Sequence, residues 1–369
     1  MTTVERRIPV MLPFLGEEEA QAAAEAVRSG WVAQGPRVAE FEKRFAAAAG
    51  AAHGIAVSSC TTALHLALIT LGVGPGDEVV VPSLSFIATA NAARYVGATP
   101  VFADVEPVSY GIDAESVRAL VTPRTKAIVV VHLYGHPVDF DPIADIAAEH
   151  GLFVVEDATE ALGSRYRGRL CGTLGDVGCF SFNGNKVMTT GGGGMVLARD
   201  PERLAHMRRL TFQGRVPGRE YIHDEVGFNY AMSNLPAAVG VAQMEELDGL
   251  LARRRAVAER YAAALAGVPG LEFCREAEWA QTNWWLQSVL VDAERYGEDR
   301  NELMDRLAGE GIEARPFFHP LHRLPPYAEF ARGELPMSDR LHATGVSIPS
   351  SASLEPSQQD RVIAALARR

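Results

Sequence analysis

The chain has 369 residues, of which 47% are hydrophobic and 22% are charged, and its formal net charge is −11. That length is enough for two domains, and the composition is typical of a globular protein with a large core. The acidic balance disfavours nucleic acid or an anionic membrane as a partner. The apolar part of the first 14 residues is too short for a signal peptide, and no 18-residue apolar run follows. We therefore expect a cytoplasmic protein without a membrane span.

Short apolar runs alternate with helical patterns through the first 250 residues. The predicted strands cover 53–59, 77–83, 98–105, 126–135, 151–158, 176–182 and 193–199. Most of these runs are β-branched and apolar on both faces, as in a buried parallel sheet. The predicted helices cover 17–30, 61–72, 85–97, 113–121 and 141–151. This alternation predicts an α/β fold with a mainly parallel central sheet, which binds ligands at the carboxyl ends of its strands.

The pattern changes from about Asp248 onward. Residues 247–270 predict one long, arginine-rich amphipathic helix, followed by a strand at 282–292 and a helix at 299–311. A proline- and histidine-rich segment, RPFFHPLHRLPPY, follows at 315–327. We predict a large domain over 1–245, including the N-terminal helix, and a smaller C-terminal α/β domain over 246–369.

Two carboxylates stand at the end of the predicted strand 151–158, in the sequence VVEDATEALGS. A charge there is costly unless it is paired. Asp157 could cap a following helix, or it could face a cationic ligand at the edge of the sheet. Glu160 could lie at the start of that helix or make a second contact with the ligand.

Lys186 lies between the predicted strand 176–182 and a run of four glycines, in SFNGNKVMTTGGGGM. A surface lysine in a loop is one interpretation, but the flanking apolar strands and the glycines favour close packing. A lysine amine away from water is a nucleophile toward carbonyl groups. In VSSCTTALHLAL (57–68), a strand runs through hydroxyl residues into a helix, whose start could bind phosphate or could be an ordinary cap.

Other cofactor and metal sites do not fit these motifs. The lysine is not followed by Ser or Thr as in a Walker loop, and GVGPG (72–76) follows a helix instead of a strand. The four cysteines form no CxxC pair, so neither structural zinc nor a disulfide framework is expected. The histidines of VHLYGH and HPLH lack a carboxylate pattern beside them, and we predict no metal site. An amine, an anion cradle and a carboxylate together match pyridoxal phosphate (PLP).

The chain resembles the DegT/DnrJ/EryC1/StrS family of nucleotide-sugar aminotransferases, which have the type I fold of aspartate aminotransferase. The resemblance covers nearly the whole length, in the motifs SGWVAQGPRVAEFEKRFA, GPGDEVVVPSLSFIATANA, VVEDATEALGS, SFNGNKVMTTGGGGM, GFNYAMSNLPAA, RPFFHPLH and GVSIPSS. It implies a PLP enzyme that passes through the pyridoxamine form. It also implies a homodimer with shared active sites.

The resemblance assigns roles by position. Lys186 matches the lysine that bonds to the cofactor and later moves a proton, and Asp157 matches the partner of the pyridine nitrogen. The other cofactor contacts implied are Cys60, Thr61 and Ser181 at the phosphate, Phe86 on the ring, Glu160 near the ring hydroxyl, and Asn229 from the neighbouring subunit. The substrate contacts implied are Trp31, Arg315 and His322. Many relatives carry Gly, Gln, Glu and Arg where this chain carries Cys60, Glu160, Gly192 and Ala231.

The implied reaction moves an amino group from L-glutamate to a keto-sugar nucleotide, giving an amino sugar for an antibiotic or a surface glycan. A 4-keto-6-deoxy sugar on dTDP or UDP is the favoured acceptor, with GDP as a further carrier. A 3-keto sugar and a 4-keto pentose stay open. So do another type I PLP reaction, such as that of a sulfur-amino-acid lyase, and a non-catalytic binding protein. The glycine run is expected to turn tightly beside the cofactor and to pack at the dimer interface.

Overall fold

A computed structural model describes residues 7–218 and 220–368, so residues 1–6 of the predicted large domain lie outside it. A seven-stranded sheet forms the centre of that domain, in the order β1-β9-β8-β5-β4-β2-β3. Its strands are β1 (Gly54–Val57), β2 (Glu78–Pro82), β3 (Thr99–Ala103), β4 (Thr125–Val131), β5 (Phe153–Asp157), β8 (Val177–Ser181) and β9 (Gly194–Ala198). Only β9 runs antiparallel to its neighbours, so the mainly parallel sheet is confirmed.

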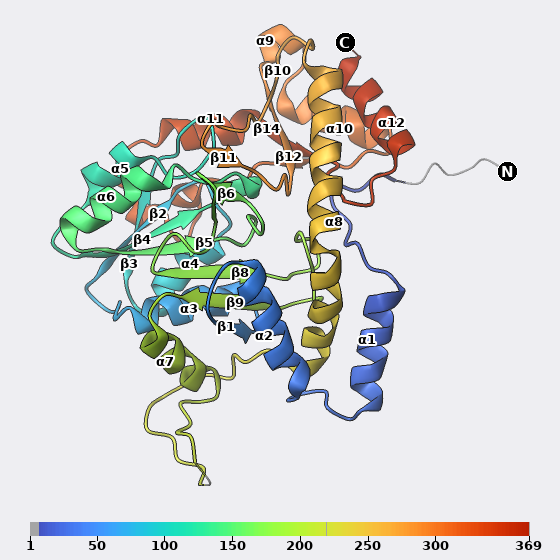
Figure 1. Ribbon diagram of the computed structural model, residues 1–369. Coiled ribbons are helices and arrows are strands. Elements are labelled where there is room, and N and C mark those ends of the chain that lie inside the picture. Colours follow the sequence, from blue (N-terminus) through green and yellow to red (C-terminus); the bar gives the residue numbers. More distant parts are fainter. Residues whose placement is uncertain (1–6, 219, 369) are drawn as a thin grey trace.

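Helices cover both faces of this sheet (Figure 1). Those on one face are α3 (Cys60–Thr70), α4 (Ala88–Tyr95) and α7 (Pro201–Thr211), and those on the other are α5 (Ala114–Leu120) and α6 (Phe140–His150). Successive side chains of a strand point to opposite faces. Val79 and Val81 of β2 therefore pack with α3, α4 and α7, and Val80 packs with α5 and α6. This double burial explains why the strands are apolar throughout.

The longest helix, α8 (Asn234–Leu265), runs from the large domain into the C-terminal domain (Figure 1). It begins 13 residues before the start predicted at 247. Gly240 lies within this helix, and a Cβ there would lie 2.8 Å from the ring of Phe41, so glycine allows the close contact. Helices α1 (Glu17–Arg28) and α2 (Pro36–Ala48) pack on α8. The helix predicted at 17–30 is thus confirmed.

The C-terminal region contains an antiparallel sheet in the order β10-β12-β14-β13. The elements here are β10 (Leu271–Phe273), β12 (Gln287–Val291), β13 (Arg315–Pro316), β14 (Gly345–Ile348), α9 (Ala293–Tyr296), α10 (Arg300–Gly309), α11 (Pro336–Thr344) and α12 (Pro356–Ala367). A small sheet joins β6 (Arg165–Tyr166), β7 (Arg169–Leu170) and β11 (Ala280–Gln281). Three single turns of 3-10 helix are η1 (Leu133–Gly135), η2 (Leu321–Arg323) and η3 (Ala328–Phe330).

The division into 1–245 and 246–369 stays a prediction, and two features cross it. Helix α8 is continuous through the boundary. Ile8 pairs with Ile312 beside the C-terminal sheet, although it belongs to the predicted large domain. Both features tie the two regions together.

One local expectation was wrong, and one of the two alternatives for Asp157 is excluded. The strand predicted at 126–135 ends at Val131, because the chain then enters η1, where Tyr134 has φ 54°. No helix follows β5, where residues 158–164 form turns. Asp157 therefore caps no helix.

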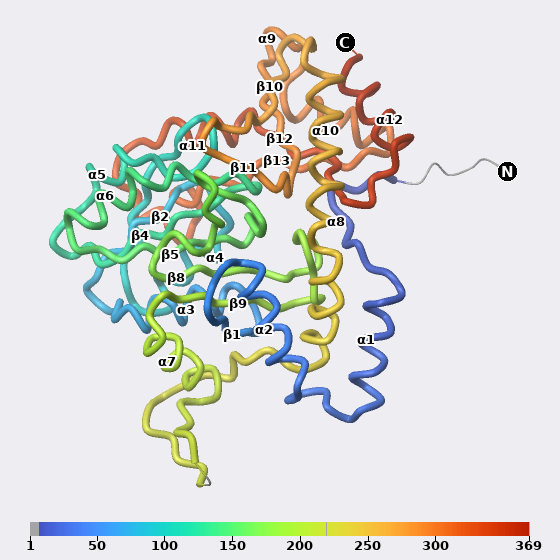
Figure 2. The backbone as a smooth tube through the Cα atoms, viewed as in Figure 1, coloured from blue at the N-terminus to red at the C-terminus, as the bar shows by residue number. Residues whose placement is uncertain are grey.

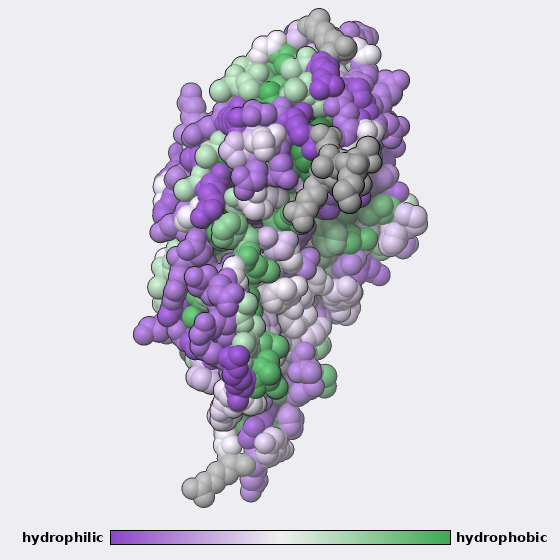
Figure 3. All heavy atoms as spheres, turned by 90° about the vertical axis from the view of Figure 1, so that its right-hand side faces the viewer, coloured by the Kyte–Doolittle hydropathy of each residue, from purple (hydrophilic) through white to green (hydrophobic). Residues whose placement is uncertain are grey.

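An arm projects from the large domain between α7 and α8, where the tube in Figure 2 leaves the body of the molecule. It exposes Tyr221, Ile222 and Val226. On the face over α1 and α12, hydrophilic residues predominate and apolar ones form a broken band (Figure 3). No helix among the described residues is long and apolar enough to cross a membrane.

Candidate active site

Lys186 lies beside the carboxyl ends of β5 and β8, with its side chain only 11% exposed. Its Nζ lies 3.3 Å from Oε1 of Glu160. On another side, Nζ lies 3.8 Å from the centroid of the Trp285 ring. The amine is thus held between a carboxylate and an aromatic face, and the interpretation of Lys186 as a surface lysine is wrong.

Asp157 is the last residue of β5 and is buried. Its Oδ2 accepts a hydrogen bond of 2.9 Å from the Thr89 hydroxyl. Its Oδ1 lies 3.9 Å from Sγ of Cys60 and accepts a 3.3 Å bond from the N–H of Thr159. The partners of this carboxylate are mostly side chains of α3 and α4, the helices that begin at the same edge of the sheet.

Glu160 lies in the turn after β5 and is buried. Its second oxygen, Oε2, accepts a 2.7 Å hydrogen bond from the N–H of Tyr134. Burial raises the pKa of the Glu160 carboxyl, and the nearby Lys186 opposes that rise. The structure therefore brings Glu160 to the amine, as a partner of Lys186.

Helix α3 begins at the site, with Ser59 as its cap: the Ser59 hydroxyl accepts a 3.2 Å bond from the N–H of Thr62. Free N–H groups at such a helix start favour an anion. Cys60 and Thr61 occupy the first turn, and Cys60 Sγ accepts a 2.8 Å bond from the Thr159 hydroxyl. Burial, together with the Asp157 charge, raises the pKa of the Cys60 thiol well above its usual range. Cys60 is therefore an uncharged thiol here.

The glycine run divides into two open positions and two crowded ones. A Cβ at Gly194 would lie 2.7 Å from backbone C of Ser59 and 2.8 Å from O of Phe180. Gly193 has φ +147°, and a Cβ there would lie 2.3 Å from Cε of Met232. Gly191 and Gly192 have nothing within 4 Å. Gly194 lets β9 pass close to the start of α3. Packing of the glycine run beside the cofactor and at a dimer interface stays a prediction.

The remaining predicted residues lie at different places. Ser181 ends β8, and Phe86 is exposed, with its ring 5.9 Å from that of Phe318. His322 is buried, and its Nδ1 lies 2.6 Å from the Ser83 hydroxyl. The other three are exposed: Asn229 at the base of the arm, Trp31 between α1 and α2, and Arg315 on β13, where it pairs with Glu313. The structure thus gathers Lys186, Asp157, Glu160 and Cys60 but places these three exposed residues outside the cluster.

Sequence reasoning missed four residues of the cluster. They are Thr89, Tyr134, Thr159 and Trp285. For Thr89 the sequence offered a weak signal, since it lies in the motif GPGDEVVVPSLSFIATANA, four residues after Ser85. In the structure the hydroxyls of these two residues lie 3.1 Å apart. Trp285 had no such signal, because it lies 99 residues away from Lys186 along the chain.

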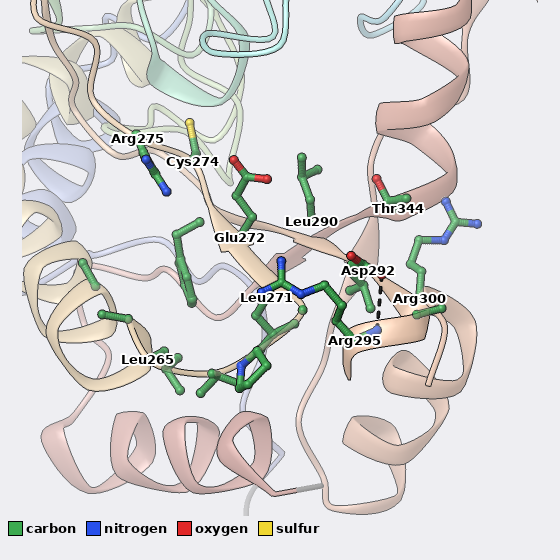
Figure 4. Close-up of a pocket in the computed structure, with 18 of the residues that line it drawn as sticks. Leu265, Leu271, Glu272, Cys274, Arg275, Leu290, Asp292, Arg295, Arg300 and Thr344 are labelled. Atoms are coloured by element: carbon green, nitrogen blue, oxygen red, sulfur yellow. Dashed lines mark hydrogen bonds between the residues drawn. The ribbon is translucent and has the colours of Figure 1, made fainter. Parts of the chain in front are cut away.

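A groove of about 1130 Å³ lies in the C-terminal region, away from these residues. Figure 4 shows its walls, where Leu265, Leu271 and Leu290 lie among arginine and acidic side chains. Asp292 accepts a 3.3 Å bond from the N–H of Arg295 there. None of the predicted site residues lines this groove, so its size alone does not connect it with the chemistry of Lys186.

The sequence profile of the DegT/DnrJ/EryC1/StrS aminotransferase family matches residues 13–367. The chain belongs to this family. It is 45% identical over 362 residues to the GDP-perosamine synthase of Caulobacter vibrioides, covering 98% of this chain and 97% of that protein. It is 40% identical to the GDP-perosamine synthase of Vibrio cholerae, covering 93% and 94%.

Solved structures agree with this assignment. The aminotransferase TlmJ of Streptoalloteichus hindustanus superimposes with a TM-score of 0.93 at 37% identity, covering 98% of each chain. The putative sugar aminotransferase Spr1654 of Streptococcus pneumoniae, solved in PLP and PMP forms, has a TM-score of 0.93 at 26% identity and covers 98% of this chain. The matched region spans 98% of the PLP-form chain and 97% of the PMP-form chain. The protein is therefore a PLP-dependent sugar aminotransferase of the type I fold.

The residues present fit PLP. A buried amine can meet the aldehyde, and a buried carboxylate at the edge of the sheet can meet the pyridinium. The start of α3, opened by Gly194, offers N–H groups to a phosphate.

Proposed function

We propose that the protein moves an amino group from L-glutamate to a 4-keto-6-deoxy sugar carried on GDP. The observation that carries this proposal is the buried Lys186 amine beside Glu160, in a chain 45% identical to a GDP-perosamine synthase. The relatives named above favour GDP over the dTDP and UDP that the motifs alone suggested.

Bound PLP would supply an aldehyde for the amino group and a ring that takes up electrons. Asp157 would then pair with the ring nitrogen, fixed in its place by the Thr89 hydroxyl. Lys186 would bond to the cofactor and carry a proton to and from the amino donor carbon. Cys60, Thr61 and Ser181 would hold the phosphate, and Phe86 would cover the ring.

We also propose a homodimer in which the arm between α7 and α8 reaches the neighbouring site. The exposed Tyr221, Ile222 and Val226 support this, because exposed apolar side chains that gather on one projecting segment mark a surface for a partner. Asn229 at its base would contact the partner's cofactor.

Three residues are proposed for the substrate. Arg315 and Trp31 are exposed, and both could meet the sugar nucleotide. His322 is proposed as the third substrate contact, and its buried ring is held with Nδ1 2.6 Å from the Ser83 hydroxyl.

A panel of keto-sugar nucleotides tests this function. The same 4-keto-6-deoxy sugar on GDP, dTDP and UDP, with a 3-keto sugar and a 4-keto pentose, is incubated with L-glutamate, and amino-sugar formation is measured. We expect the highest kcat/KM for the GDP form. Turnover restricted to a dTDP or UDP substrate would overturn the choice of carrier.

The chemistry has its own control. Lys186→Ala should lose the visible absorption band of lysine-bound PLP and all turnover, whatever the sugar. An unchanged spectrum in that variant would overturn the role of Lys186. Elimination from a sulfur amino acid in place of glutamate-dependent conversion to the pyridoxamine form would instead indicate a lyase.

A further inference from the structure

The aromatic face beneath Lys186 comes from a distant part of the chain. Trp285 lies between β11 and β12, yet its ring centroid is 3.8 Å from Lys186 Nζ. The residue is only 2% exposed, so water does not compete for this contact. An indole face attracts a cation more strongly than a neutral amine, most of all where both are desolvated.

Trp285 is fixed at every polar atom. Its indole N–H donates a 2.7 Å bond to the carbonyl of Asn185, directly before Lys186. Its backbone N–H donates a 2.9 Å bond to Oδ1 of Asn283. Its carbonyl accepts a 3.1 Å bond from Arg254. An indole held in this way cannot swing away from the amine.

Arg254 connects this support to the loop of Lys186. It lies on α8, is buried, and also donates to the carbonyls of Ser350 at 3.2 Å and Lys186 at 3.5 Å. Its other contact is the thioether of Met11. The Arg254 guanidinium therefore contacts the large domain through Lys186, the C-terminal region through Trp285 and Ser350, and the N-terminal segment through Met11.

We propose that Trp285 is a positioning residue for the transamination, stabilising the ammonium form that Lys186 takes while it carries the proton and fixing the direction of Nζ. The proposal rests on the function argued above, in which Lys186 carries a proton. Glu160 favours the same charged form from the other side. The other charged or titratable groups around the amine are Asp157, the Cys60 thiol, the Arg254 guanidinium and Tyr134, whose ring stacks on Trp285. Trp285 reaches the amine from the loop between β11 and β12.

The test measures the pH at which Lys186 becomes reactive. PLP is added to purified protein from pH 6 to 10, the bond is trapped with borohydride, and the initial rate of labelling of the Lys186 peptide is measured by mass spectrometry. The wild-type protein is measured first, and the absence of label on its Lys186 would overturn the proposed function itself. With the label present, the variants test Trp285 alone.

Trp285→Leu removes the aromatic face, and we expect half-maximal labelling to move on the order of one pH unit lower, because the charged amine has lost its support. Trp285→Phe keeps a weaker face and should move less in the same direction. Glu160→Gln should also move it lower, whereas the neighbouring Trp284→Phe should leave it at the wild-type pH.

A second readout follows the proton. With glutamate deuterated at Cα, the isotope effect on kcat should rise in Trp285→Phe while KM for glutamate stays within about twofold, because a misdirected amine slows proton transfer more than binding. If Trp285→Leu does not fold, Trp285→Phe decides both readouts. A folded Trp285 variant with the wild-type pH of labelling and the wild-type isotope effect would overturn the proposal.

Discussion

Glu156 and Asp157 are neighbours on β5, have the same charge and are both buried, at 0% and 6% exposure. Their side chains nevertheless point to opposite faces of the sheet and meet different surroundings. Glu156 faces the loop after β7. It accepts hydrogen bonds from the N–H groups of Gly172, Leu174 and Gly175 at 2.6–2.7 Å, and it lies 2.9 Å from Nε2 of His132. Its acceptor positions are occupied by the scaffold.

Asp157 faces the opposite side, toward the cluster of Lys186. Its oxygens receive one hydroxyl, one long thiol contact and one backbone N–H. Burial of a carboxylate is costly unless it is hydrogen-bonded. The comparison teaches that the alternation of one strand separates a carboxylate that organises a loop from one that is available to a ligand.

Among the variants that test this comparison, Asp157→Asn has the largest expected effect on catalysis. The amide has the same shape, so we expect the protein to fold and to bind PLP. Turnover should fall by about 100- to 1000-fold, a range typical of removing one electrostatic contact from a transition state. Cofactor content and kcat are measured on the same sample. Turnover within a few fold of wild type would remove Asp157 from the proposed mechanism.

Glu156→Gln is the matched variant on the other face. One amide NH₂ would point at backbone N–H groups that now donate to a carboxylate oxygen, and such buried mismatches cost roughly 1–3 kcal/mol each. We expect a loss of about 3 kcal/mol in the free energy of unfolding, with kcat per bound cofactor close to wild type. Urea unfolding measures the first and the glutamate half-reaction the second. A large loss of kcat in a stable protein would contradict the division between the two faces.

The glycine run allows a smaller test of the same site. Gly194→Ala should destabilise the protein by about 2 kcal/mol, because its Cβ would overlap backbone atoms that cannot move aside. Gly192→Ala should stay within about 0.5 kcal/mol of wild type, because that position is open. Thermal unfolding of both variants, with PLP affinity as a second measurement, checks the pair. Equal losses in both would show that crowding at the start of α3 is not what selects glycine.

Much of the scaffold is predictable because burial leaves a local signature. The seven central strands are apolar on both faces, and the motif around Lys186 follows a strand that ends at the same edge as β5. The position of Lys186 and Asp157 at that edge follows from the parallel order of the strands. The resemblance to a family then supplied the roles that spacing alone left open.

The rest depends on contacts between distant segments. Trp285 reaches Lys186 only because α8 and the N-terminal segment hold the C-terminal region in place, and no local pattern records that. The early start of α8 was missed because its first turns are held by packing on α1 and α2, which no local pattern records. The partnership of Glu160 with Lys186 needed the turn after β5, where a helix was considered.

The smallest expected effect is the contribution of Glu160 to the pH dependence of the free energy of unfolding. The sign of this contribution follows from the surroundings of the carboxyl. Burial raises the pKa of its carboxyl above 4.5 in the folded state, with Lys186 opposing. A group with a raised folded pKa contributes stability that is complete below the unfolded value and is lost as pH rises through the folded one. The free energy of unfolding of wild type, relative to Glu160→Gln, should therefore fall as pH rises from about 4 to 8. Urea unfolding across that range measures the difference, with the exposed Glu259→Gln on α8 as control. A difference that grows with pH would mean that pairing with Lys186 outweighs the cost of burying the carboxylate.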